Sequence, residues 1–134
     1  THGQDEALAL ADEIVVMNNA VIEQAGSARD VFNAPRTAFV ARFLGGHNVI
    51  ALPEGKVAVR SDAVRMTDAG AGRMPAQITA VEYQGTHVNV TAAVAGEQEV
   101  TALLPDALYF AQPRHPGEPV GLTWENDQQH PLQA

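Results

Sequence analysis

The chain has 134 residues, of which 46% are hydrophobic and none is cysteine, so it can bury a core but forms no disulfides. Its net charge of -8 and its single lysine, Lys56, weigh against binding to nucleic acid or to an anionic membrane surface. No apolar run is as long as a membrane-spanning helix, and the first residues lack the pattern of a signal peptide.

The first predicted element is a helix, although its sequence imitates a magnesium-binding strand. Residues 8–13, "LALADE", form an apolar run that ends in Asp12-Glu13, as in the strand that brings carboxylates to magnesium in nucleotide hydrolases. However, alanine and leucine are strong helix formers, and Asp5-Glu6 place negative charge where a helix would begin. We therefore expect Asp12-Glu13 at a helix end and outside any magnesium site.

Residues 14–46 predict a hairpin and two short helices. The β-branched segments 14–17 and 21–24 flank Asn18-Asn19-Ala20, and asparagine tolerates the positive φ of a tight turn. Ser27 is expected to cap a helix that ends before Pro35. Thr37 is expected to cap the next helix, which Gly45-Gly46 ends. This second helix carries an apolar stripe at spacings of three and four, formed by Phe39, Val40, Phe43 and Leu44.

From Asn48 onward the sequence is typical of β-structure. Short β-rich segments recur between Gly, Pro and Asp residues, and Gln84-Gly85-Thr86 is expected to join two of them in a hairpin. The sequence "DAGAGR", residues 68–73, predicts a mobile loop. The fold class is therefore mainly β, a small barrel or sandwich. The predicted strands are Val49–Leu52, Lys56–Arg60, Ala63–Thr67, Ala76–Tyr83, His87–Val94, Glu99–Leu104 and Val120–Trp124.

Motifs that would support catalysis or metal binding are missing from this sequence. The only Gly-Lys pair, Gly55-Lys56, lacks the preceding glycine and the following Ser or Thr of a phosphate-binding loop. The remaining candidates are weak on their own. His47, His87, His115 and His130 show no metal-ligand spacing, and core packing is the safer interpretation of Tyr83, Tyr109 and Trp124, although such rings could stack a ligand.

The first third of the chain resembles the end of the nucleotide-binding domain of ABC importer ATPases. The stretch "THGQDEALALADEIVVMNNAVIEQAGSARDVFNAPRTAFVARFLGG" is similar to the subgroup that serves polyamines, ferric iron, sulfate and sugars. By this resemblance His2 is the switch histidine, which reaches the γ-phosphate of ATP in the complete ATPase. The resemblance also implies that the magnesium-site carboxylates precede this histidine, so Asp12-Glu13 follow the catalytic centre, and "FLGGHN" is a helix stop and not the family's signature sequence.

The remainder resembles the C-terminal extension of the same family, an OB-like β-barrel region called TOBE. The segments "VAVRSDAVRMT", "AVEYQGTHVNVTA" and "PGEPVGLTWENDQQHPL" are similar to its Arg-Pro-Glu strand, its Tyr-x-Gly hairpin and its closing strand. The expected division is residues 1–46 for the end of the nucleotide-binding domain and residues 47–134 for the TOBE-like barrel. Three positions depart from the family: Gly3 replaces Asp, Ala20 replaces a turn glycine, and Ser61-Asp62 replaces Pro-Glu.

The resemblance implies a regulatory and dimerising segment of an importer ATPase and no catalysis by the segment alone. ATP and magnesium are expected only in the complete parent, together with membrane permease subunits, at the cytoplasmic face of the membrane. A homodimer is expected because the apolar stripe would be exposed without the ATPase body. The alternative is a free-standing dimeric module that binds an oxyanion through backbone amides near Gly85-Thr86. An OB-type nucleic-acid binder is disfavoured, since basic stripes and interleaved aromatics are lacking.

Overall fold

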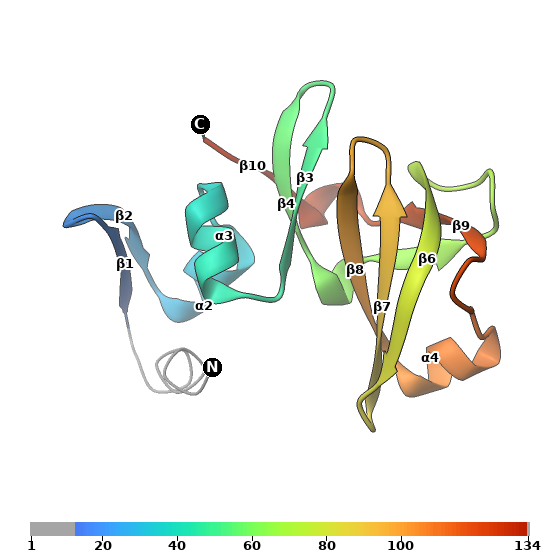
Figure 1. Cartoon of the computed structure of the whole chain (residues 1–134). Coiled ribbons are helices and arrows are strands. Elements are labelled where there is room, and N and C mark those ends of the chain that lie inside the picture. The colour runs from blue at the N-terminus through green and yellow to red at the C-terminus, as the bar shows by residue number, and fades with distance from the viewer. Residues whose placement is uncertain (1–12, 134) are drawn as a thin grey trace. The chain divides into compact units, whose positions relative to one another are not determined.

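The structure, a computed structural model, describes residues 13–133. The described residues fall into two compact units: residues 13–58 with 129–133, and residues 59–128 (Figure 1). Within residues 13–133 no helix has both the length and the apolar character needed to cross a membrane. These packing units do not test the predicted domain boundary between residues 46 and 47, which rests on family resemblance and stays a prediction.

The first unit begins with the predicted hairpin. Strands β1 (Ile14–Asn18) and β2 (Val21–Gly26) pair antiparallel. Their turn places Asn19 at φ 52° and Ala20 at φ 66°, so both residues adopt the left-handed conformation. Such φ values suit asparagine and glycine better than alanine. The hairpin therefore forms with Ala20 at a position that favours glycine. Asn19 is the turn residue that tolerates a positive φ better.

Two capped helices follow, as predicted. Helix α2 (Ala28–Asn33) begins where the Ser27 hydroxyl accepts a hydrogen bond from the Asp30 N–H. Helix α3 (Ala38–Leu44) begins in the same way, with Thr37 accepting from the Val40 N–H, and it ends at Gly45 with φ 76°. Each cap satisfies a backbone donor that the first helical turn leaves unpaired.

The buried side chain of Gln24 braces the bend between the two helices. Its amide nitrogen donates to the Ala34 carbonyl at 3.1 Å, and its carbonyl oxygen accepts from the Arg36 N–H at 2.9 Å. These two backbone groups flank Pro35, which has no N–H of its own to offer. The glutamine and proline that carry part of the family resemblance therefore have a structural role in this bend.

The core of these helices and the hairpin corrects one expectation. Val16, Val31, Val40 and Leu44 form a buried cluster, with Ile14, Phe32 and Phe39 packed against it. Val40 is fully buried, whereas Phe43 remains 44% exposed. The apolar stripe is thus not exposed as a whole, because the β1–β2 hairpin and α2 cover half of it within the chain itself.

A three-stranded sheet completes the first unit, in the order β10 (Gln129–Pro131), β4 (Gly55–Arg60), β3 (His47–Leu52). Two further backbone bonds extend the return of the chain, from Leu132 N–H to Lys56 O at 2.9 Å and from Gln133 N–H to Arg36 O at 2.7 Å. The predictions for Val49–Leu52 and Lys56–Arg60 hold with small changes at the ends, whereas β10 was not predicted.

The second unit is built on a five-stranded antiparallel sheet in the order β5-β9-β6-β7-β8. A six-residue helix, α4 (Asp106–Ala111), follows β8. Two 3-10 turns, η1 (Ser61–Ala63) and η2 (Asn126–Gln128), lie near the first and the last residues of the second unit. The strands are β5 (Arg65–Thr67), β6 (Met74–Tyr83), β7 (His87–Val94), β8 (Gln98–Pro105) and β9 (Pro119–Thr123).

The strand pattern of this unit confirms a mainly β fold. Alternate residues of β7 are buried, which is the period of a strand with one face on a core. The β6–β7 hairpin turns at residues 84–86 as predicted. Two predictions need correction: the expected strand Ala63–Thr67 starts with the η1 turn, and helix α4 occupies a segment for which no helix was predicted.

Candidate functional site

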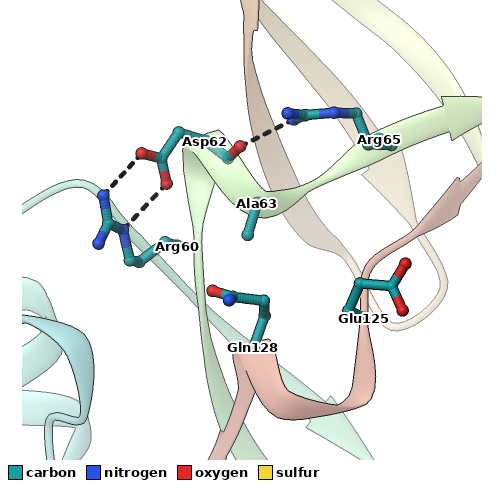
Figure 2. Close-up of a pocket in the computed structure, with 6 residues that line it drawn as sticks. All are labelled: Arg60, Asp62, Ala63, Arg65, Glu125 and Gln128. Carbon is teal, nitrogen blue, oxygen red and sulfur yellow. Dashed lines mark hydrogen bonds and ion pairs between the residues drawn. The ribbon is translucent and has the colours of Figure 1, made fainter.

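One hollow of the second unit has a volume of about 470 Å³ and is open to solvent. Its lining comes from two segments far apart in sequence, the η1–β5 region and the η2 turn (Figure 2). The lining residues are Arg60, Asp62, Ala63, Arg65, Glu125 and Gln128. The first four belong to the "VRSDAVRM" segment, where Ser61-Asp62 stand in place of the family's Pro-Glu.

Arg60 and Asp62 neutralise each other at one edge of this hollow (Figure 2). The η1 turn directly after β4 brings the two side chains together over a separation of two residues. The guanidinium donates from Nε to Oδ1 at 3.0 Å and from Nη2 to Oδ2 at 2.7 Å. This bidentate ion pair fixes the relative orientation of the two side chains. Because both side chains are partly exposed, the pair contributes little to the free energy of folding.

The other groups of the hollow offer both signs of charge. Arg65 donates from Nη1 to the carbonyls of Asp62 at 2.8 Å and Val64 at 3.0 Å, and forms no ion pair with any described residue. The side chains of Glu125 and Gln128 make no hydrogen bond to any other residue within 13–133. The lining of this hollow therefore combines two guanidinium groups with two carboxylates, so its charges balance.

A smaller hollow of about 270 Å³ lies beside α4. Met66, Leu104 and Leu108 give it an apolar lining, together with Arg65, Gln112 and Arg114. Arg114 is only 6% exposed and donates to Glu118 at 3.1 Å, while Tyr109 donates to the Arg114 carbonyl at 2.6 Å. Arg114 thus fixes the segment after α4, and its charge is already balanced.

This network makes a pH-dependent contribution to stability that Glu118→Gln should remove. The hydrogen bond from Arg114 and the N–H of His115 hold the pKa of Glu118 below its ordinary value of 4.5. A lowered pKa in the folded state stabilises the fold above the ordinary pKa, and this stabilisation is lost as the pH falls through the folded value. The variant should therefore unfold at a lower denaturant concentration than the parent at pH 7, and the gap should close as the pH falls below 4.5 through the lowered folded value.

Denaturant titrations at several pH values between 7 and 3 would measure this gap. Glu125→Gln is the matched control, since Glu125 has no cationic partner within the described residues. A gap that stays constant down to pH 3 would show that the Arg114–Glu118 pair makes no proton-linked contribution.

The predicted site residues are scattered or lie outside the described part of the chain. His2 falls in residues 1–12, outside the described residues, and so do Asp12 and Gly3. Among residues 13–133 no group of three His, Cys, Asp or Glu side chains could hold a metal. His47 instead places its ring nitrogens 2.7 Å from the Gly45 carbonyl and 2.6 Å from the Phe32 carbonyl, where it helps to hold α2 and α3 together.

The three candidate stacking rings separate into two kinds. Tyr109 and Trp124 are 7% and 4% exposed, which confirms the core-packing interpretation for both. Tyr83 is 61% exposed and lies against Phe110, with ring centroids 5.8 Å apart. Sequence reasoning missed the second ring because Phe110 lies on the unpredicted helix α4. In the run "DALYF" after Pro105 only the alanine and the leucine are strong helix formers, which is a weak signal for a helix.

A family model of the TOBE domain matches residues 57–132, more than half of the chain. The chain therefore belongs to the TOBE domain family, and its mainly β structure agrees with that assignment. This match lies within the predicted barrel region, residues 47–134, and includes the residues of β10.

The curated relatives identify the kind of protein that carries this domain. The chain is 32% identical over 142 aligned residues to the uncharacterized ABC transporter ATP-binding protein YdcT of Escherichia coli K12, covering 98% of this chain and 42% of the relative. It is 46% identical over 66 residues to the spermidine/putrescine import ATP-binding protein PotA of Bacillus thuringiensis, covering 49% of this chain and 20% of the relative. The chain is thus a TOBE-containing part of an ABC importer ATP-binding subunit, and it spans less than half the length of these relatives.

Among solved structures, the chain is similar to the cytoplasmic molybdate-binding protein ModG, with a TM-score of 0.49 and 15% identity. The similarity covers 55% of this chain and 57% of that protein. The oxyanion-binding alternative stays a prediction.

Proposed function

We propose that this chain is the regulatory and dimerising part of an ATP-binding subunit whose complete form couples ATP hydrolysis to solute import. The observation that carries the proposal is the alignment with the ATP-binding protein YdcT, which runs through 98% of this chain and so includes both compact units. In the complete subunit, ATP and magnesium bind to segments outside this chain, permease subunits are the membrane partners, and the assembly lies at the cytoplasmic face of the membrane.

The β1–β2 hairpin supports this proposal independently. Four of its apolar side chains are about half exposed or more: Val15, Met17, Val21 and Ile22. Exposed apolar side chains gathered on one hairpin usually mark a contact with another segment or protein. The relatives extend well beyond the aligned region, so the remainder of a nucleotide-binding domain is available to cover this face.

The first experiment is to read the coding sequence upstream of Thr1 and then test His2 in the complete subunit. We expect that sequence to supply a phosphate-binding loop, a Leu-Ser-Gly-Gly-Gln segment and an apolar run ending in Asp-Glu. His2→Ala should then lower the rate of ATP hydrolysis by about 10²–10³-fold, since it removes a hydrogen-bond donor to the transferring phosphate. Gly3→Asp, which restores the family residue beside it, should leave hydrolysis intact.

Translation that starts at or near Thr1, or full hydrolysis by the His2→Ala subunit, would contradict the proposal. In either case the chain would have to be considered as a free-standing module. Calorimetric titration with molybdate, tungstate and sulfate would then decide the oxyanion alternative, because a module without heat or thermal shift does not bind these ions.

The dimer is tested separately by sedimentation of the chain at increasing concentration. We expect a homodimer at about tens of micromolar, the range in which weak dimers commonly form. A chain that remains strictly monomeric there would contradict self-association through this segment alone, while the role as part of an ATPase would stand on the hydrolysis experiment.

A further inference from the structure

One end of the second unit carries an exposed aromatic surface that the proposed function does not use. Tyr83 ends β6, and Phe110 lies on α4, which sits beside the end of the β6–β7 hairpin in Figure 1. The two rings meet edge to face at 5.8 Å and are 61% and 57% exposed. We define the aromatic platform as Tyr83, Asp106 and Phe110.

Contacts with Tyr109 and Thr86 fix the position of the aromatic platform. The buried ring of Tyr109 lies edge-on to Phe110 at 5.1 Å, and the Tyr109 hydroxyl is fixed by its bond to the Arg114 carbonyl. The Asp106 N–H donates to the Thr86 carbonyl at 3.0 Å, which ties the start of α4 to the hairpin turn. Two exposed rings held in this way lose little conformational freedom on binding, which is the property of a binding hot spot.

The charge at the platform is negative and uncompensated. Asp106 lies four residues before Phe110 on α4, so the two side chains are neighbours on one face of the helix. One carboxylate oxygen of Asp106 accepts from the Ala107 N–H, and the carboxylate forms no ion pair with any described residue. Residues 82–87 and 105–111 contain no Lys or Arg, and the second unit has nine acidic and four basic residues, a net charge of -5.

The other charged groups near the platform do not offset Asp106. Glu82 lies on the opposite face of β6, where its carboxylate accepts from Gln84, and His87 contacts the Thr86 hydroxyl through Nδ1. The guanidinium of Arg114 is buried toward Glu118 and the smaller hollow. A cation approaching the two rings therefore meets the Asp106 carboxylate and the negative faces of the aromatic rings.

We propose that the aromatic platform is a docking surface for an arginine-bearing segment of a partner protein. A guanidinium stacks on tyrosine and phenylalanine faces and can pair with the Asp106 carboxylate, while flanking apolar side chains cover the ring edges. A second copy of this chain is a poorer fit, because each copy carries a net charge of -8.

The test is an NMR titration of the chain with the blocked peptide acetyl-Leu-Arg-Leu-amide. We expect amide shifts confined to residues 83–87 and 106–111, with a dissociation constant of about 1–10 mM for so short a peptide. The matched probe replaces arginine with citrulline, which keeps the shape and removes the charge, and should bind about fivefold more weakly. Equal binding of both peptides, or no shift at about 10 mM peptide, would overturn the proposal.

Substitutions at the platform distinguish a loss of peptide binding from a loss of the fold. Tyr83→Ala with Phe110→Ala should abolish the shifts, whereas Tyr83→Phe should keep them because the ring remains. Asp106→Asn should weaken the arginine peptide about two- to fivefold and leave the citrulline peptide unchanged. Unchanged β7 amide signals in the double variant show that its fold is intact, and arginine binding retained by that folded variant would overturn the proposal. Shifts at the platform that appear with protein concentration alone would overturn it in favour of self-association.

Discussion

Replacing Gly121 with alanine should destabilise the second unit by about 3 kcal/mol or more. Gly121 lies in β9, where its backbone pairs with Thr67 of β5 on one side and Pro75 of β6 on the other. A Cβ built there would lie 1.9 Å from the Ala71 carbonyl oxygen and 2.5 Å from the Thr67 hydroxyl. The first of these is backbone, so the loop 68–73 must move as a whole or β9 must leave its register.

Chemical denaturation of the variant and the parent measures this effect. Gly85→Ala is the matched control: it has φ +89° and nothing within 4 Å of its added Cβ, so only the backbone conformation opposes it, at about 1–2 kcal/mol. Similar losses for the two variants would show that loop 68–73 yields easily and does not hold β9. The loop has two backbone bonds, from Ala71 N–H to Asp68 O and from Arg73 N–H to Leu122 O, which oppose that movement.

Features set by neighbouring residues were predictable from the sequence. The caps at Ser27 and Thr37 depend on groups three residues away, and both formed as expected. Strand β7 occupies His87–Val94 as predicted, because strict alternation specifies both its type and its buried face. The TOBE assignment was also confirmed, by a family match over residues 57–132, but it rested on the resemblance of three segments to a known family and not on local physical rules.

Features set by distant residues were not predictable in this way. The larger hollow needs the η1–β5 segment and the η2 turn, about 60 positions apart in sequence, and no local pattern brings them together. Strand β10 forms only because the chain returns to β4. The aromatic platform joins Tyr83 to Phe110 through helix α4, and a six-residue helix is too short to give a clear period.

Introducing aspartate at Val40 should unfold the helical part of the first unit, with a loss of about 3 kcal/mol or more. Val40 has no exposed surface and belongs to the cluster with Val16, Val31 and Leu44, so the carboxylate would be buried without a partner. The second unit has its own core and should keep its structure. Hydrogen exchange resolved by residue should show lost protection in residues 28–44 and retained protection in β6, β7 and β8.

Phe43→Asp is the matched control, since it places the same charge three residues further along the same helix. Phe43 is 44% exposed and stacks on Phe39 with centroids 5.9 Å apart, so its replacement should cost only about 1 kcal/mol. The two variants also distinguish an effect on folding from an effect on association.

If the exposed part of the stripe supports the dimer, Phe43→Asp should produce a folded monomer, because a charge at the rim of an apolar contact blocks association while the buried core stays apolar. A Val40→Asp chain as stable as the Phe43→Asp chain would mean that Val40 does not pack in the core in solution, and the whole stripe would again be available for association.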